Sequence, residues 1–186
     1  MLKQFGSHKA PGPDGIIPLV LQNLSEQTLD VLVTIYKAIK FLGYTPKAWR
    51  LSETIFIAKP GKDTYDNVES FRPITLADYM YKGYKRVELW HLERTHFAEK
   101  PLTAMQFAFR KGRSTETALS RTVNKIEKAL EGGEQGIGVF LDIKGAFDRL
   151  DHDAAILALR KRGITEDFVG WYEHYLRNRT TTANLA

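Results

Sequence analysis

Val139-Phe140-Leu141-Asp142-Ile143-Lys144-Gly145-Ala146-Phe147-Asp148 is the most informative stretch of this sequence. Three apolar residues lead into Asp142, and an aromatic side chain follows five residues later. The apolar run predicts a strand buried on both faces, because such strands read as continuous hydrophobic runs. A carboxylate at the end of the strand can hold a divalent cation. In phosphoryl transfer, two cations roughly 3.5–4 Å apart stabilise the attacking and leaving oxygens, so the stretch indicates a metal site for that chemistry.

Four other blocks precede this stretch, and their order is as informative as their residues. They read Lys9-Ala10-Pro11-Gly12-Pro13-Asp14-Gly15-Ile16, Ile55-Phe56-Ile57-Ala58-Lys59-Pro60-Gly61-Lys62-Asp63, Ser70-Phe71-Arg72-Pro73-Ile74-Thr75-Leu76 and Gln106-Phe107-Ala108-Phe109-Arg110-Lys111-Gly112-Arg113-Ser114-Thr115-Glu116. With the Asp142 stretch, which is similar to the first catalytic motif of reverse transcriptases, they resemble the polymerases of non-LTR retrotransposons. Group II intron polymerases share the general plan, but Lys-Pro-Gly-Lys-Asp and Phe-Leu-Asp-Ile-Lys-Gly-Ala-Phe-Asp look most like the non-LTR elements. The resemblance covers roughly residues 8–180.

The resemblance implies an α+β fold made of reverse-transcriptase fingers and part of the palm. We expect it to be mostly helical, with a finger β-hairpin and the start of an antiparallel palm sheet. Residues 1–135 would form the fingers, including a palm-packing helix at about 115–132, and residues 136–186 a truncated palm with the first catalytic motif. The implied activity is that of a nucleotidyltransferase, an RNA-directed DNA polymerase.

The same resemblance implies the cofactor and the partners. The expected metal is Mg²⁺, with Mn²⁺ as the alternative. The expected partners are an RNA template, a DNA primer, deoxynucleoside triphosphates and the downstream palm and thumb of the same polyprotein. The family implies a place in the nucleus or cytoplasm. No apolar run approaches 18 residues, so the sequence offers no membrane span.

The resemblance implies functional roles for two residues of the Asp142 stretch. Asp142 is expected to be the catalytic metal ligand. Phe147 stands where these enzymes place a bulky ring under the sugar of the incoming nucleotide, and such a ring excludes a 2′-hydroxyl by collision. The alternative for Phe147 is simple core packing. Asp148 is expected to be a structural polar partner and not a ligand.

Basic residues of the other blocks are expected to contact phosphates. Arg72 and a lysine of the loop, Lys59 or Lys62, should clamp the triphosphate, because guanidinium offers bidentate bonds and ammonium a compact charge. The sequence does not separate the two lysines, and one of them could simply be solvated. Arg110, Lys111 and Arg113 are expected to bind nucleic acid.

The block around Arg113 is predicted to open a helix. Free backbone N–H groups at residues 112–115 would favour an anion such as a template phosphate. The alternative is an ordinary helix cap with surface arginines. Ala108 replaces the glycine usual in this block, so the loop geometry is in question if that position needs a positive φ angle.

Two further carboxylates are expected in this family, in an Asp-Asp hairpin preceded by a Gln-Gly block. Neither feature follows Asp142, and no Asp-Asp pair occurs in the sequence. We therefore expect the front part of a polymerase, without upstream domains such as an endonuclease, and inactive by itself. The alternative function is a noncatalytic nucleic-acid-binding remnant. The absence of cysteine excludes thiolate metal sites, and the net charge of +5 fits a nucleic-acid partner without proving one.

Hydrophobic spacing predicts the main elements. A short helix over 17–24 and a longer one capped by Ser25 and ended by Gly43 should precede a hairpin with strands at 53–58 and 72–76. Further helices are expected at 78–96, from Ser114 or Thr115 to Leu130, from Asp151 to Gly163 and from Thr165 to Asn178. Predicted core positions are Leu29, Leu32, Val33, Tyr36, Ile39, Tyr81, Tyr84, Leu89, Leu92, Ala118, Val123, Ile126, Leu130 and the tryptophans Trp49, Trp90 and Trp171.

Overall fold

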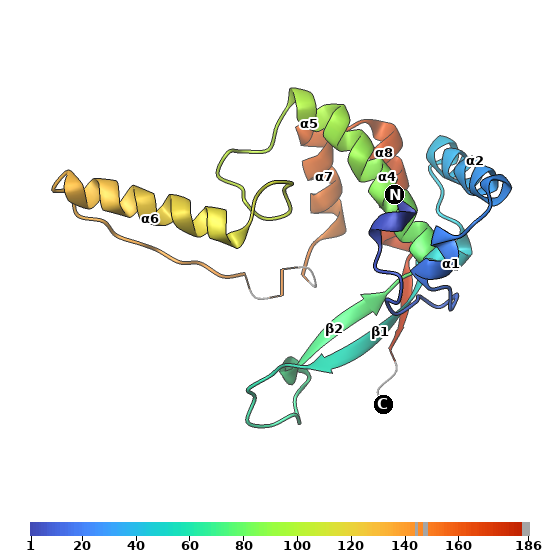
Figure 1. The fold of residues 1–186 in the computed structure, drawn as a ribbon, viewed down its shortest axis with the longest axis horizontal. Helices are drawn as coiled ribbons and strands as arrows, with labels where there is room; N and C mark the ends of the chain where they lie inside the picture. Colours follow the sequence, from blue (N-terminus) through green and yellow to red (C-terminus); the bar gives the residue numbers. More distant parts are fainter. Residues whose placement is uncertain (144, 147–148, 184–186) are drawn as a thin grey trace. The chain divides into compact units, whose positions relative to one another are not determined.

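The computed structural model describes residues 1–143, 145–146 and 149–183 (Figure 1). The chain divides into two compact units, the first made of Met1–Glu93 with Leu150–Ala186 and the second of Arg94–Arg149. Helices predominate and a small sheet accompanies them, which confirms the predicted α+β class. None of the helices within the described residues is long and apolar enough to cross a membrane.

The sheet lies in the first unit and has the order β2-β1-β3. β1 (Leu51–Ala58) and β2 (Phe71–Leu76) form the predicted antiparallel hairpin, and β3 (Thr180–Ala183) pairs with β1 in parallel. The loop between the hairpin strands starts at Pro60-Gly61. Gly61 has a φ of 75°, a left-handed conformation that glycine adopts without a steric penalty, and so the chain can turn there.

Several helices of the first unit begin and end at the predicted signals. Ser25 accepts a hydrogen bond from the Thr28 N–H at the start of α2, and Gly43 ends that helix with a φ of 59°. Asp151 caps α7 in the same way through the Ala154 N–H. The helical elements of this unit are η1 (Leu2–Gln4), α1 (Pro18–Gln22), α2 (Glu26–Leu42), α3 (Lys47–Arg50), η2 (Val68–Ser70), α4 (Tyr79–Arg94), α7 (His152–Arg162) and α8 (Glu166–Asn178).

The core of the first unit is an aromatic cluster between α2, α4 and α8. The rings of Tyr84 and Trp171 meet edge to face with centroids 5.0 Å apart, and Tyr36 meets Tyr84 at 5.4 Å. The Trp171 indole donates to the hydroxyl of buried Thr45 at 3.0 Å, which satisfies both polar groups away from water. Burial raises the pKa of Tyr84 above its ordinary value. Trp171 is thus the packing anchor that the sequence predicts.

Some predicted core positions are wrong in this unit. Leu29 and Val33 are 36% and 47% exposed on α2, and Leu89 is 49% exposed on α4. The helical spacing identified an apolar stripe correctly, but the neighbouring elements cover only part of its width. Leu32, Tyr36 and Ile39 on α2 and Tyr81, Tyr84 and Leu92 on α4 are buried as predicted.

The second unit contains α5 (His96–Glu99) and α6 (Thr115–Glu131). The Ser114 hydroxyl accepts from the Thr117 N–H, and the Thr117 hydroxyl accepts from the Ser114 N–H, a reciprocal capping box. The predicted buried stripe of α6 is wrong, because Val123, Ile126 and Leu130 are 40%, 48% and 60% exposed. No residue of the helix is buried.

The predicted buried strand at Val139–Leu141 is also wrong. These residues form no strand, and Phe140 and Leu141 are more than 90% exposed. A strand requires a neighbour that pairs its N–H and C=O groups. Within the described residues, β1 pairs only with β2 and β3, and no strand pairs with the Asp142 stretch.

Candidate nucleotide and nucleic-acid site

Asp142 lies in an exposed, irregular segment of the second unit. Further along this segment the Arg149 N–H donates to the Gly145 carbonyl at 3.0 Å. Gly145 has a φ of 67°, a left-handed angle that favours glycine. Gly145 therefore allows a backbone conformation at this position that other residues rarely adopt. Lys144, Phe147 and Asp148 lie outside the described residues, so the predicted role of Phe147 stays a prediction.

The described residues do not by themselves complete a metal site. No three side chains of the His, Cys, Asp or Glu type come together within the part of the chain that the structure describes. A carboxylate oxygen is a ligand that a hard divalent cation accepts, so Asp142 has suitable chemistry. One carboxylate is too few, since two cations need several such ligands.

The hairpin brings two of the predicted phosphate ligands onto one face of the first unit. Arg72 on β2 pairs with Ile57 on β1, and the Lys59 N–H extends the ladder by donating to the Ser70 carbonyl at 2.8 Å. Opposed residues and residues two apart along a strand share a face. Arg72 and Lys59 therefore lie on the same face, at the loop end of the hairpin.

The two loop lysines differ in their surroundings. The Lys59 ammonium donates to the Glu69 carbonyl at 2.8 Å, and the Lys59 carbonyl accepts from the Tyr65 hydroxyl at 2.9 Å. Lys59 thus ties the two sides of the loop together. Lys62 is exposed and makes no hydrogen bond or ion pair with the described residues. The structure therefore distinguishes two lysines that the sequence left equivalent.

Arg110 organises the loop before α6. Its Nη1 donates to the carbonyl of Thr103 at 2.7 Å, and more distantly to those of Leu102 and Gln106 at 3.3 and 3.4 Å. Arg113 lies over the ring of Phe107, 4.9 Å from its centroid. Lys111 between them is exposed. Of the three residues predicted to bind nucleic acid, Arg110 has a structural role within its own loop that the sequence did not indicate.

Ala108 does not disturb this loop. The left-handed residues here are Phe109, with a φ of 57°, and Gly112, with a φ of 72°. A left-handed angle is uncommon for a residue with a side chain and costs roughly 1–2 kcal/mol. The unusual conformation falls one residue after Ala108, on a phenylalanine that is 92% exposed.

The first block makes a contact that sequence reasoning missed. A Cβ at Gly12 would lie 2.4 Å from the Asp78 carboxylate and 2.5 Å from the backbone of Ala77, so only glycine fits. The Asp14 N–H donates to the Asp78 carboxylate at 3.3 Å. Asp78 is buried, and this burial raises its pKa. The Gly12 signal was visible between two prolines, but the identity of its partner was not.

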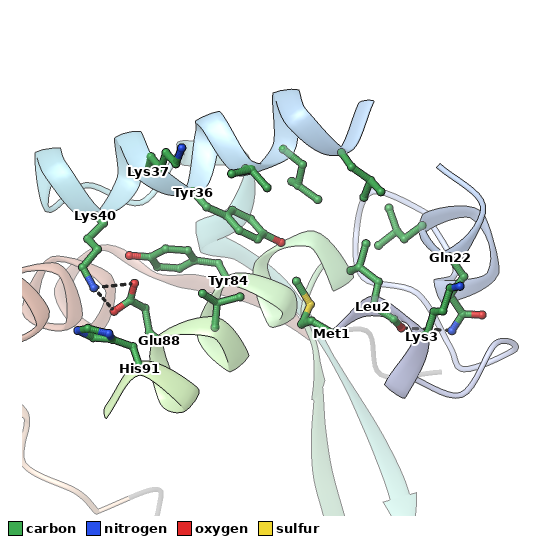
Figure 2. A pocket seen from close by; sticks show the side chains of 15 residues that line it. Met1, Leu2, Lys3, Gln22, Tyr36, Lys37, Lys40, Tyr84, Glu88 and His91 are labelled. Carbon is green, nitrogen blue, oxygen red and sulfur yellow. Dashed lines mark hydrogen bonds and ion pairs between the residues drawn. The ribbon is translucent and has the colours of Figure 1, made fainter. Parts of the chain in front are cut away.

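A separate hollow of about 590 Å³ lies between η1, α1, α2 and α4 (Figure 2). Leu29 and Val33, the exposed residues of the α2 stripe, line it. At one end Lys40 forms an ion pair with the Glu88 carboxylate at 3.1 Å. None of the predicted site residues lines this hollow, although Lys3 and Lys37 add two further cations to its lining.

Comparison with known proteins identifies the chain. Residues 57–185, from the hairpin through the Asp142 stretch, match the family described as reverse transcriptase (RNA-dependent DNA polymerase). The RNA-directed DNA polymerase from mobile element jockey of Drosophila melanogaster is 35% identical over 153 residues, which cover 82% of this chain and 17% of the relative.

Two further relatives agree. The jockey polymerase of Drosophila funebris is 38% identical over 152 residues, which cover 82% of this chain and 16% of the relative. The probable RNA-directed DNA polymerase from transposon BS of Drosophila melanogaster is 32% identical over 178 residues, covering 96% of this chain and 19% of the relative. The chain spans less than a fifth of the length of these relatives. It belongs to the reverse transcriptase family, among the RNA-directed DNA polymerases of non-LTR retrotransposons.

Proposed function

We propose that this chain contributes the fingers and the first catalytic carboxylate to RNA-templated DNA synthesis. The observation that carries the proposal is the family match over residues 57–185, because it includes the hairpin loop, β2, the loop before α6 and Asp142. The substrates are an RNA template, a DNA primer and deoxynucleoside triphosphates. The division into fingers at 1–135 and partial palm at 136–186 is part of the proposal.

Asp142 is the proposed metal-binding residue, and Mg²⁺ is the proposed ion, with Mn²⁺ as the alternative. Bound there, a divalent cation would neutralise charge on the reacting phosphate. The exposure of Asp142 leaves its carboxylate free to take part. A divalent cation at Asp142 needs further oxygen ligands besides this carboxylate.

Arg72 and a loop lysine are proposed to hold the triphosphate. The Arg72 guanidinium on β2 can bind a phosphate with two parallel hydrogen bonds, and a lysine of the adjacent hairpin loop can meet the next phosphate. Lys62 has a free ammonium, whereas Lys59 is bound to the Glu69 carbonyl. We therefore assign the phosphate contact to Lys62 and the shaping of the loop to Lys59.

The proposal is tested by a chimera in which these 186 residues replace the matching segment of the Drosophila melanogaster jockey polymerase. We expect primer extension on an RNA template. Arg72→Gln and Lys62→Gln should raise the KM for the nucleotide by roughly tenfold each, the effect of losing about 1.4 kcal/mol of binding. Lys59→Gln should raise it less. RNA binding by a soluble chimera that does not extend primers would favour the noncatalytic alternative.

Phe147 is proposed to exclude ribonucleotides. In the same chimera Phe147→Val should admit them, with discrimination falling about thirtyfold if roughly 2 kcal/mol is lost. The measurement is the ratio of kcat/KM for matched deoxynucleotides and ribonucleotides. An unchanged ratio in an active Phe147→Val enzyme would assign Phe147 to packing instead.

A further inference from the structure

α6 carries three distinct faces. At 3.6 residues per turn, its large apolar residues Leu119, Val123, Ile126 and Leu130 fall along one line. Arg121, Lys125 and Lys128 fall along a second line on the opposite side. The acidic residues Glu116, Glu127 and Glu131 lie between these two lines. Whatever surface covers the apolar line, the basic line stays open on the far side of the helix.

The basic line borders a hollow within the second unit. This hollow has a volume of about 800 Å³ and is lined by the basic line of α6, by Ser120 and Asn124 beside it, and by Met105 and Phe107 of the preceding loop. One wall is therefore cationic and rich in hydrogen-bonding groups, and the other is apolar. Arg113 holds the Phe107 ring through a cation–π contact, so this wall is positioned by its own loop.

The cations of this wall are uncommitted. Arg121, Lys125 and Lys128 are exposed, and none of them forms a hydrogen bond or ion pair with the described residues. Arg110, in contrast, is occupied by carbonyls of its own loop. Three free cations along one side of a helix at intervals of four and three residues form a track for a line of negative charges.

We propose that this hollow is a binding groove for single-stranded RNA, with phosphates along Arg121, Lys125 and Lys128 and unpaired bases against Phe107 and Met105. The proposal rests on the proposed function, in which such a strand is the template. The basic line spans about 10 Å at 1.5 Å per residue, a length that roughly three phosphates of one strand occupy. A basic track beside an apolar wall suits a single strand, because a duplex hides the faces of its bases.

The test is fluorescence anisotropy with the full 186-residue chain and a labelled, unstructured RNA of about 12 nucleotides. The triple variant Arg121→Gln, Lys125→Gln, Lys128→Gln should bind at least about tenfold more weakly at low salt. Its log–log salt slope should be shallower by about 2, since each phosphate contact to a single strand contributes roughly 0.7. Glutamine keeps helix propensity, and circular dichroism checks that α6 remains.

A matched control removes the same charge elsewhere. Lys9, Lys37 and Lys161 are exposed, so the triple variant of these three lysines to glutamine has the same net charge as the α6 variant. We expect it to keep its affinity within about twofold to threefold. Equal weakening by both variants, an unchanged salt slope, or no binding by the unsubstituted chain would overturn the proposal.

The apolar wall is tested separately. Phe107→Leu should weaken binding of the single strand by about fivefold or more, whereas Phe107→Tyr keeps a ring and should restore it. Equal affinity for a double-stranded RNA of the same length would overturn the single-strand assignment, and tighter binding of the same sequence as DNA would overturn the assignment to the template. Displacement by polyglutamate as effectively as by unlabelled RNA would instead indicate an acidic protein partner.

Failure of this inference and failure of the proposed function are distinguishable. RNA binding is measured without nucleotide or primer, and Asp142→Asn should leave it unchanged. A chimera that extends primers normally with the α6 triple variant, while binding RNA as tightly as before, would overturn the groove and leave the polymerase assignment in place.

Discussion

α2 and α6 are helices of equal length that behave differently. Each has seventeen residues and a serine cap, and each carries an apolar line at helical spacing. α2 buries Leu32, Tyr36 and Ile39, whereas α6 buries no residue. The difference arises from the neighbours. α2 packs against α8 and, through Tyr36, against α4, and α6 has no such surface within the described part of its own unit.

The comparison shows that an amphipathic pattern predicts a helix and its apolar face, but not the surface that covers it. The same holds for the Asp142 stretch, where a typical strand sequence has no partner strand among the described residues. Both exposed segments, α6 and Val139–Ile143, belong to the second unit. We expect the first unit to carry most of the stability of the chain.

The largest expected effect is a difference in stability between two isoleucine variants, one in each unit. Ile39 on α2 is 3% exposed and Ile126 on α6 is 48% exposed. Ile39→Ala should lower the free energy of unfolding by about 3 kcal/mol, because it leaves a cavity in the core. Ile126→Ala should change it by less than about 0.5 kcal/mol. Urea unfolding followed by far-ultraviolet circular dichroism, which reports the helices of both units, measures both variants, and equal losses would show that α6 is buried in solution.

Removing a serine cap should have a smaller effect than removing the buried isoleucine, and that effect should differ between α2 and α6. Ser25→Ala should lower the free energy of global unfolding by about 1 kcal/mol, since α2 is part of the cooperative core. Ser114→Ala removes half of a capping box, but its effect should stay local. It should speed hydrogen exchange in α6 and leave the urea midpoint unchanged. A shift of the midpoint by both variants would mean that the two units unfold together.

The smallest expected effect concerns pH. Asp78 lies in the first unit, and burial raises its pKa, although the hydrogen bond from the Asp14 N–H partly opposes this. The folded chain therefore binds this proton more tightly than the unfolded chain. The contribution of Asp78 to stability is present at low pH and is lost as pH rises from the ordinary aspartate pKa through the raised one.

Asp78→Asn should remove the loss of stability with rising pH, because asparagine does not ionise. Its side-chain oxygen can still accept from the Asp14 N–H. The variant should compare more favourably with the unsubstituted chain at pH 7 than at pH 4. Unfolding midpoints across this range measure the difference. A constant difference between the two chains, or a difference that changes with pH in the opposite direction, would contradict the assignment.

Local signals in the sequence predicted much of the fold. Ser25, Gly43, Asp151 and Gly163 placed helix ends correctly, because caps depend on residues within one turn. Pro60-Gly61 placed the turn that begins the hairpin loop. Burial was predicted less well, as Leu89 and Leu130 show, since it depends on elements distant in the sequence.

The features of the candidate site also fall into those that the sequence predicted and those that it did not. Residue types and order indicated the family and placed Arg72 on the hairpin. They could not show that Lys59 binds the Glu69 carbonyl or that Arg110 binds three carbonyls, because such contacts depend on loop conformation. The basic line of α6 was readable as a helical pattern, but the Met105 and Phe107 wall beside it was not.

The most direct test compares Asp142→Asn with Asp151→Asn in the jockey chimera. Both variants replace one aspartate by its amide, and asparagine caps α7 about as well as Asp151 does. RNA-templated primer extension should fall by about a hundredfold or more for Asp142→Asn, since roughly 3 kcal/mol of transition-state stabilisation is removed, and by less than about twofold for Asp151→Asn. Equal activities of the two variants, or no extension by the unsubstituted chimera, would contradict the assignment of Asp142 as the catalytic carboxylate.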